Sequence, residues 1–105
     1  MHARVTSVMI RPDAFTEAIR IYQDSIVSAI ASHKGFHTAD LIVDRSSGEG
    51  LSVTVWETEE DGKAYEASGT YQEQVAKLAQ YFASKPTLRT YDVAVHAQVP
   101  ARVSG

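Results

Sequence analysis

Residues 35–61, with the sequence GFHTADLIVDRSSGEGLSVTVWETEED, decide the fold of this chain. They contain two stretches typical of β-strands, 36–44 and 51–57, joined by a polar loop that includes two glycines. In the second stretch apolar side chains alternate with small hydroxyl side chains, which predicts a strand with two different faces. Because the loop is short, the two strands should form an antiparallel hairpin. The only tryptophan, Trp56, ends this hairpin, either as a large core residue or as the wall of a small-molecule pocket.

The segments on both sides of the hairpin contain further regular elements. Apolar residues recur at steps of three and four between Pro12 and Gly35, a pattern typical of a helix with one buried face. Thr58 and Thr70 each precede an acidic residue by three positions, which indicates the start of two more helices. We therefore expect a strand over 4–10, a helix from Pro12 to Gly35, helices over 59–68 and 70–82, and a last strand over 88–97.

The resulting order, β-α-β-β-α-α-β, predicts an α+β protein with a ferredoxin-like split β-α-β arrangement, in which the helices cover one face of an antiparallel sheet. We expect one domain over 1–105, with a core over about 4–97 and a C-terminal tail or arm over 98–105. The other sheet face also carries apolar side chains, and leaving each in water would forgo roughly 1.5–3 kcal/mol. A homodimer formed through this open face would bury them.

Composition excludes several classes of function. The chain has 105 residues, a formal net charge of −3 and no basic cluster, so neither nucleic acid nor a membrane surface is an expected partner. It contains no cysteine, which excludes disulfides, thiolate metal sites and cysteine nucleophiles. No signal-peptide pattern is present, and a cytoplasmic location is expected.

Four local patterns resemble a known family. They are the Gly35-Phe36 entry into the second strand, the exit Val55–Thr58 from the third, the helix entry at Tyr71 and the closing strand at Tyr91–Val93. Together they resemble the antibiotic biosynthesis monooxygenase family of the dimeric α/β barrel superfamily. The resemblance implies a dimer whose two sheets pack into a barrel, with a pocket in each subunit between sheet and helices. It also implies a cofactor-independent monooxygenase acting on a small phenolic, quinol-like or anthrone-like compound.

Haem-degrading relatives in this family use an asparagine, a tryptophan and a histidine. By position Trp56 matches the tryptophan, but Ser7 stands at the asparagine position and the expected helix over 59–68 contains no histidine. This argues against haem degradation. It also leaves open a non-catalytic dimer that binds a small hydrophobic ligand or has no turnover. Haem binding through another ligand is a third alternative.

Candidate site residues follow from these alternatives. Trp56 would stack on a flat substrate, and His37 or His96 would act as general base, since imidazole titrates near neutral pH; the alternative is a core indole and two exposed histidines. The expected pocket-lining residues are Ser7, Tyr22, Thr54 and Tyr65. We expect no metal site, because Gly35 interrupts the helix between His33 and His37.

Overall fold

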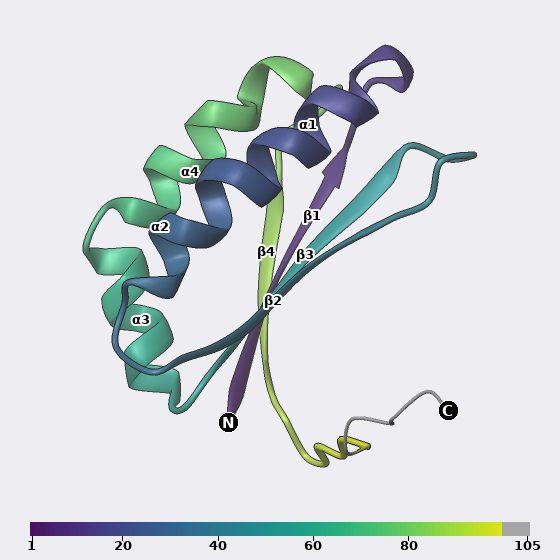
Figure 1. Ribbon diagram of the computed structural model, residues 1–105. Helices are drawn as coiled ribbons and strands as arrows, with labels where there is room; N and C mark the ends of the chain where they lie inside the picture. The colour runs from purple at the N-terminus through teal and green to yellow at the C-terminus, as the bar shows by residue number, and fades with distance from the viewer. Residues whose placement is uncertain (100–105) are drawn as a thin grey trace, which may run out of the picture.

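A four-stranded antiparallel sheet, with all helices on one face, forms the part of the chain that the computed structural model describes, residues 1–99 (Figure 1). The strands are β1 (His2–Met9), β2 (Phe36–Val43), β3 (Glu49–Trp56) and β4 (Thr87–Asp92). Their order across the sheet is β2-β3-β1-β4, so β1 and β3 are central. This topology confirms the ferredoxin-like α+β prediction. The predicted tail begins within the described part, and its residues 100–105 lie outside it.

The helices form two segments that lie side by side over one face of the sheet. The first helical body runs without a break from a 3-10 turn at Pro12–Ala14 through α1 (Phe15–Ile21), a π-helical segment at Tyr22–Ile26 and α2 (Val27–Ala31). The second comprises α3 (Glu59–Ala67), α4 (Thr70–Leu78) and a 3-10 turn at Ala79–Tyr81. Within residues 1–99, no helix has both the length and the apolar character needed to cross a bilayer.

Two predicted helix starts have different outcomes. Thr58 caps α3 as predicted, because its hydroxyl accepts a hydrogen bond from the backbone N–H of Asp61 at 3.1 Å. Thr70 does not cap α4. Gly69, with φ of 88°, holds the cap position and leaves Thr70 as the first helical residue, with its hydroxyl bonded to the ring of His33 at 3.0 Å. The positive φ favours glycine at this position, and the turn that it makes replaces the predicted capping box.

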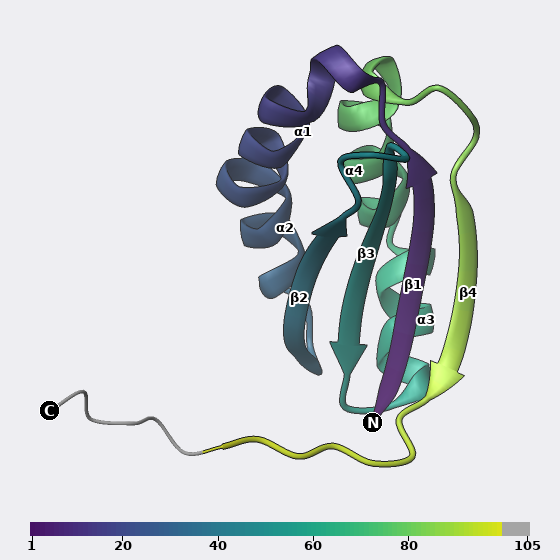
Figure 2. The ribbon, with the colours of Figure 1, turned by 90° about the vertical axis from the view of Figure 1, so that its right-hand side faces the viewer.

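The strands differ from the predicted ranges at their ends. β1 begins two residues earlier, at His2, and β4 ends at Asp92 instead of extending to residue 97. β4 pairs only with β1, so it ends where that partner ends, at the pair His2–Asp92. In Figure 2, which looks onto the uncovered sheet face, the chain after β4 runs away from the sheet.

The register separates the side chains of the central strands into two sets. Those facing the helices are His2, Arg4, Thr6 and Val8 on β1, opposite Trp56, Thr54, Ser52 and Gly50 on β3. Those on the uncovered face are Ala3, Val5, Ser7 and Met9, opposite Val55, Val53, Leu51 and Glu49. On the edge strands, Ile42 of β2 and Tyr91 of β4 extend the second set and are 55% and 48% exposed. The uncovered face is therefore mainly apolar, as the sequence predicted.

Candidate functional site

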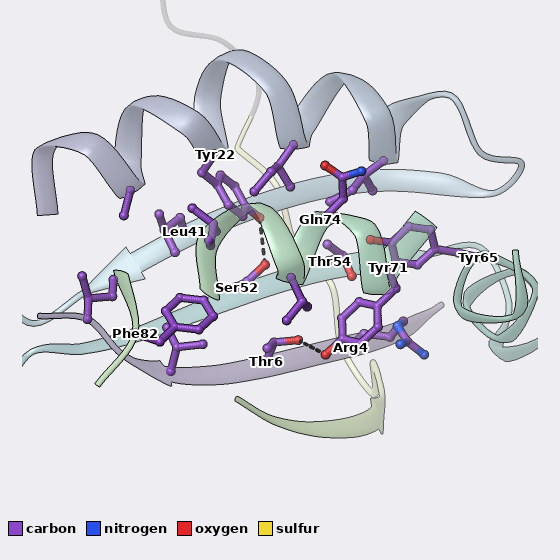
Figure 3. A pocket seen from close by; sticks show the side chains of 17 residues that line it. Arg4, Thr6, Tyr22, Leu41, Ser52, Thr54, Tyr65, Tyr71, Gln74 and Phe82 are labelled. Carbon is purple, nitrogen blue, oxygen red and sulfur yellow. Dashed lines mark hydrogen bonds between the residues drawn. The ribbon is translucent and has the colours of Figure 1, made fainter. Parts of the chain in front are cut away.

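A small cavity lies between the sheet and the helices (Figure 3). Its volume is about 60 Å³, enough for a few water molecules. Most of its wall is aliphatic or aromatic. The polar side chains in the wall are Arg4, Thr6, Ser52 and Thr54 from the sheet, and Tyr22, Tyr65, Tyr71 and Gln74 from the helices.

The polar residues of the sheet form a compact group because the two central strands pair in register. Arg4 lies opposite Thr54, and Thr6 lies opposite Ser52, all on the face that the helices cover. Side chains two residues apart on a strand point to the same face, so this group follows directly from the alternation in each strand. The cavity therefore has a polar floor and a largely apolar roof.

Two tyrosine hydroxyls from the roof bond to this floor. Tyr22 and Ser52 share a hydrogen bond of 2.9 Å, and Tyr71 and Thr6 share one of 3.2 Å (Figure 3). Tyr22 belongs to the π-helical segment, where the backbone N–H of Val27 donates to the carbonyl of Tyr22, five residues earlier. Single π-helical turns inside α-helices occur frequently at functional sites. Burial is the main cause that raises the pKa of Tyr22, so this phenol stays neutral and can donate a hydrogen bond.

Arg4 provides the only cation in the cavity wall. Its side chain is 4% exposed, and its Nη2 donates to the Glu66 carboxylate at 2.8 Å. The guanidinium also lies over the rings of Tyr71 and Tyr65, 5.1 Å and 5.8 Å from their centroids. Helix α3 approaches it closely at Gly62, where a Cβ would lie 3.2 Å from Arg4 Cδ. Arg4 Nε has no hydrogen-bond partner within residues 1–99, so part of its donor capacity is unused.

Trp56 lies behind the cavity wall. Its side chain is completely buried, and the indole N–H donates to the Thr54 hydroxyl at 2.9 Å. The indole stacks on the ring of Tyr65 with centroids 4.9 Å apart and an angle of 23° between the planes. Tyr65 itself lines the cavity, and burial raises the pKa of its phenol, an effect that the nearby Arg4 charge partly opposes. Trp56 thus supports Tyr65 and is not among the lining residues.

The structure separates the candidate residues proposed from sequence. Tyr22, Thr54 and Tyr65 line the cavity, whereas Ser7 lies on the opposite sheet face, paired with Leu51. His37 occupies a bulge at the start of β2, where its ring pairs with the carboxylate of Glu57 at the molecular surface.

His96 lies beyond the end of β4 and is exposed. Within residues 1–99, no three histidine, aspartate or glutamate side chains gather in a way that would hold a metal ion.

Sequence reasoning missed Arg4, Thr6, Tyr71 and Gln74 as polar lining residues. The signal for Arg4 was present in the alternation of β1. Arg4 and Thr6 share a face with Val8, which made a polar group on a buried strand face visible before the structure. The signal for Gln74 was weaker. Gln74 lies four positions before the buried Leu78, so both residues share one helix face.

Comparison with known proteins identifies the family. The sequence profile described as antibiotic biosynthesis monooxygenase matches residues 1–77, most of the chain. The chain belongs to this family. The match includes every residue of the cavity's polar wall, from Arg4 to Gln74. Among curated protein sequences, no match to this chain is found.

Solved structures of low sequence identity share the fold. A monooxygenase of Streptomyces coelicolor in complex with nanaomycin D superposes with a TM-score of 0.77 at 14% identity, covering 95% of this chain and 92% of that one. A protein of Mycobacterium tuberculosis gives 0.72 at 18% identity, with 92% and 98% coverage. A conserved protein of Methanosarcina mazei gives 0.71 at 13% identity, with 87% and 91% coverage. These likenesses extend over nearly the whole chain.

Proposed function

We propose that this protein is a cofactor-independent monooxygenase that oxidises a small aromatic compound, of phenolic, quinol or anthrone type, in the cavity between sheet and helices. The observation that carries this proposal is the combination of an apolar cavity with a buried polar floor and one buried cation, Arg4. The family membership supports the reaction class, and the bound nanaomycin D of the Streptomyces coelicolor protein supports a small-molecule ligand.

In this reaction the substrate supplies every electron. An anthrone-type methylene loses both hydrogens and becomes a carbonyl with one oxygen atom of dioxygen, while the second oxygen atom leaves as water. The step requires a deprotonated, electron-rich substrate, which transfers electrons to dioxygen more easily than the neutral form. The task of the protein is therefore to stabilise a phenolate or enolate.

The cavity wall is suited to that task. The guanidinium of Arg4 places a positive charge at one end, and an opposite charge at close range favours the ionised form of a phenol. Tyr65, with a pKa raised by burial, remains neutral and can donate a hydrogen bond to the ligand. Because the surrounding wall is apolar, these interactions are weakened little by water.

The general base is the least supported part of this proposal. Within the described chain, the cavity wall contains no histidine, aspartate or glutamate. His37 and His96 lie outside it, so the role of either as general base stays a prediction. A substrate whose hydroxyl is acidic enough to ionise beside Arg4 needs no such base.

One observation favours a second candidate, a family member that binds a small hydrophobic ligand without turning it over. The cavity of about 60 Å³ is well below the roughly 300–1,000 Å³ of typical ligand pockets, so an aromatic ligand must displace side chains or helices to enter. Together with the missing base, this size fits a protein that binds weakly and has no catalytic cycle.

Oxygen consumption separates the two candidates. With anthrone as substrate, the wild-type protein should consume oxygen faster than buffer alone, and Arg4→Met should lower the protein-dependent rate by about tenfold or more. Arg20→Met removes an exposed arginine that pairs with Glu17 and is the matched control. Thermal stabilisation by anthrone without oxygen consumption would establish the second candidate. If anthrone neither stabilises the protein nor causes oxygen consumption, both candidates are refuted.

We further propose that the protein is a homodimer through the uncovered sheet face. Several apolar side chains of this face are exposed in a single chain: Ile42 is 55%, Tyr91 48% and Met9 37% exposed. A second copy would remove them from water, and a two-fold contact of one face with itself is the commonest arrangement. The family is commonly dimeric, which supports this assembly.

A further inference from the structure

A buried polar atom in the cavity wall, Oε1 of Gln74, lacks a hydrogen-bond partner within residues 1–99. The carboxamide of Gln74, on the face of α4 that meets the sheet, belongs to a residue that is 5% exposed. An unpaired polar atom in such a place costs folding free energy, and an apolar side chain of the same length would avoid that cost.

Other polar side chains of the wall have hydrogen-bond partners within the protein. Tyr22 is bonded to Ser52, Tyr71 to Thr6, and the Thr54 hydroxyl accepts the indole N–H of Trp56. Within residues 1–99, the polar groups of the wall that lack a hydrogen-bond partner include Gln74 Oε1, Arg4 Nε and the Tyr65 hydroxyl. Arg4 already donates to Glu66 through Nη2, whereas the side chains of Gln74 and Tyr65 make no hydrogen bond in the same part of the chain.

The Tyr65 hydroxyl also makes no hydrogen bond within residues 1–99. Figure 3 shows the ring projecting from α3 with its hydroxyl directed into the cavity, and the Gln74 side chain, from α4, lines the same cavity. Stacking on Trp56 and an edge contact with Tyr71, with centroids 6.0 Å apart, fix the orientation of this ring. A fixed donor and an unpaired carboxamide thus face the same small space.

We propose that Gln74, together with Tyr65, is the specificity-determining residue of this cavity and binds a hydroxyl group on an aromatic ligand. This inference rests on the proposed function. A carboxamide offers both an acceptor and a donor, and a phenolic hydroxyl both donates and accepts, so the match holds for either orientation of the amide. A site of this kind discriminates against analogues without the hydroxyl, because its buried polar groups then stay unpaired.

A matched pair of probes tests this inference. A methyl group and a hydroxyl group are similar in size, so 1-methylnaphthalene and 1-naphthol differ mainly in hydrogen bonding. By equilibrium dialysis, we expect the wild-type protein to bind 1-naphthol about tenfold more tightly, the equivalent of one good hydrogen bond. Gln74→Met should reduce this ratio to near one. It should also raise the Tm by several degrees, because it removes the unpaired amide.

Two further variants complete the test. Gln80→Met changes an exposed glutamine in the 3-10 turn that follows α4 and should leave both the ratio and the Tm unchanged. Tyr65→Phe keeps the ring and its stacking, and should lower the preference for 1-naphthol several-fold. This variant also decides the matter if Gln74→Met does not fold.

The outcomes separate this inference from the proposed function. If the wild-type protein binds both probes equally, or if Gln74→Met keeps the preference, Gln74 does not select a hydroxyl, while aromatic binding stands. The first of these results would mean that water alone satisfies the amide. If the wild-type protein binds neither probe, the proposed function is refuted together with the role of Gln74.

Discussion

The two faces of the central strands β1 and β3 differ in a way that reverses the usual pattern. The face that the helices cover carries a group of polar side chains, Arg4, Thr6, Ser52 and Thr54, whereas the uncovered face carries Val5, Leu51, Val53 and Val55. In an antiparallel sheet with one covered face, polar residues are expected outside and apolar residues inside. Each face therefore suggests a binding partner outside the single chain.

The two sheet faces favour different binding partners, a small ligand on one and a second protein surface on the other. On the covered face, the buried polar atoms without a partner, Gln74 Oε1 and Arg4 Nε, favour a ligand that hydrogen-bonds, since leaving them unpaired costs free energy. On the uncovered face, the apolar side chains of the central strands, flanked by Asp40 and Arg89 on the edge strands, favour contact with another apolar surface. The family membership accommodates both interpretations, a pocket on one side of the sheet and a second subunit on the other.

The largest expected effect comes from a charge in the middle of the uncovered face. Val53 lies opposite Val5 on one side and Asp40 on the other. Val53→Glu should abolish the proposed dimer, because an unpaired carboxylate in an apolar interface, beside another carboxylate, costs several kcal/mol or about a 100-fold loss of affinity. Sedimentation analysis should then give the monomer mass of 11.5 kDa, in contrast to about twice that for the wild type.

Ala76→Glu is the control for this change. It introduces the same charge at an exposed position of α4 and should leave the mass unchanged. A wild-type protein that sediments as a monomer at micromolar concentration would contradict the dimer directly. In that case the apolar face would need a different partner.

The second-largest expected effect concerns Trp56, which packs behind the cavity wall on the covered face. Trp56→Ala should lower the free energy of unfolding by about 3–5 kcal/mol, because it removes the one large side chain that is completely buried. Trp56→Phe should cost much less, since a ring remains to stack on Tyr65. Urea denaturation at a fixed protein concentration measures both. A loss below about 1 kcal/mol for the alanine variant would show that the indole is not a structural support.

The sequence predicted the fold well because the fold depends on periodic patterns. The alternation in residues 51–57 and the three-and-four spacing after Pro12 each specify one element and its buried face. The ends of elements were less predictable. At Thr70 the capping pattern was correct in composition, but Gly69 adopts a positive φ and moves the cap by one residue. Such a shift depends on local turn geometry, which composition does not determine.

The site was predicted only in part, and the reason is its assembly from distant segments. Tyr22, Thr54 and Tyr65 come from elements whose buried faces were readable, so their position in the wall follows from periodicity. Ser7 was placed on the wrong side of the sheet, because its position came from the resemblance and not from the alternation of β1. The cavity also depends on the packing of α4 against the sheet, which no local pattern describes.

The smallest expected effect is a pH dependence that belongs to the covered face alone. Burial raises the pKa of Tyr65, so the folded protein keeps this phenol neutral where the unfolded chain ionises, above about pH 10. The stabilisation is complete below pH 10 and is lost as the pH rises through the folded pKa. Unfolding free energy should then fall by about 1.4 kcal/mol per pH unit for this residue.

Tyr65→Phe should remove that slope, whereas Tyr81→Phe, which deletes the hydroxyl of a partly exposed tyrosine at the end of the second helical segment, is the matched control and should retain it. Urea titrations between pH 9 and pH 11 make the comparison. Equal slopes in both variants would mean that Tyr65 titrates as freely as a surface phenol, and water would then have to reach the cavity. Water would then solvate the polar floor. The polar side chains on the covered sheet face would no longer require a ligand.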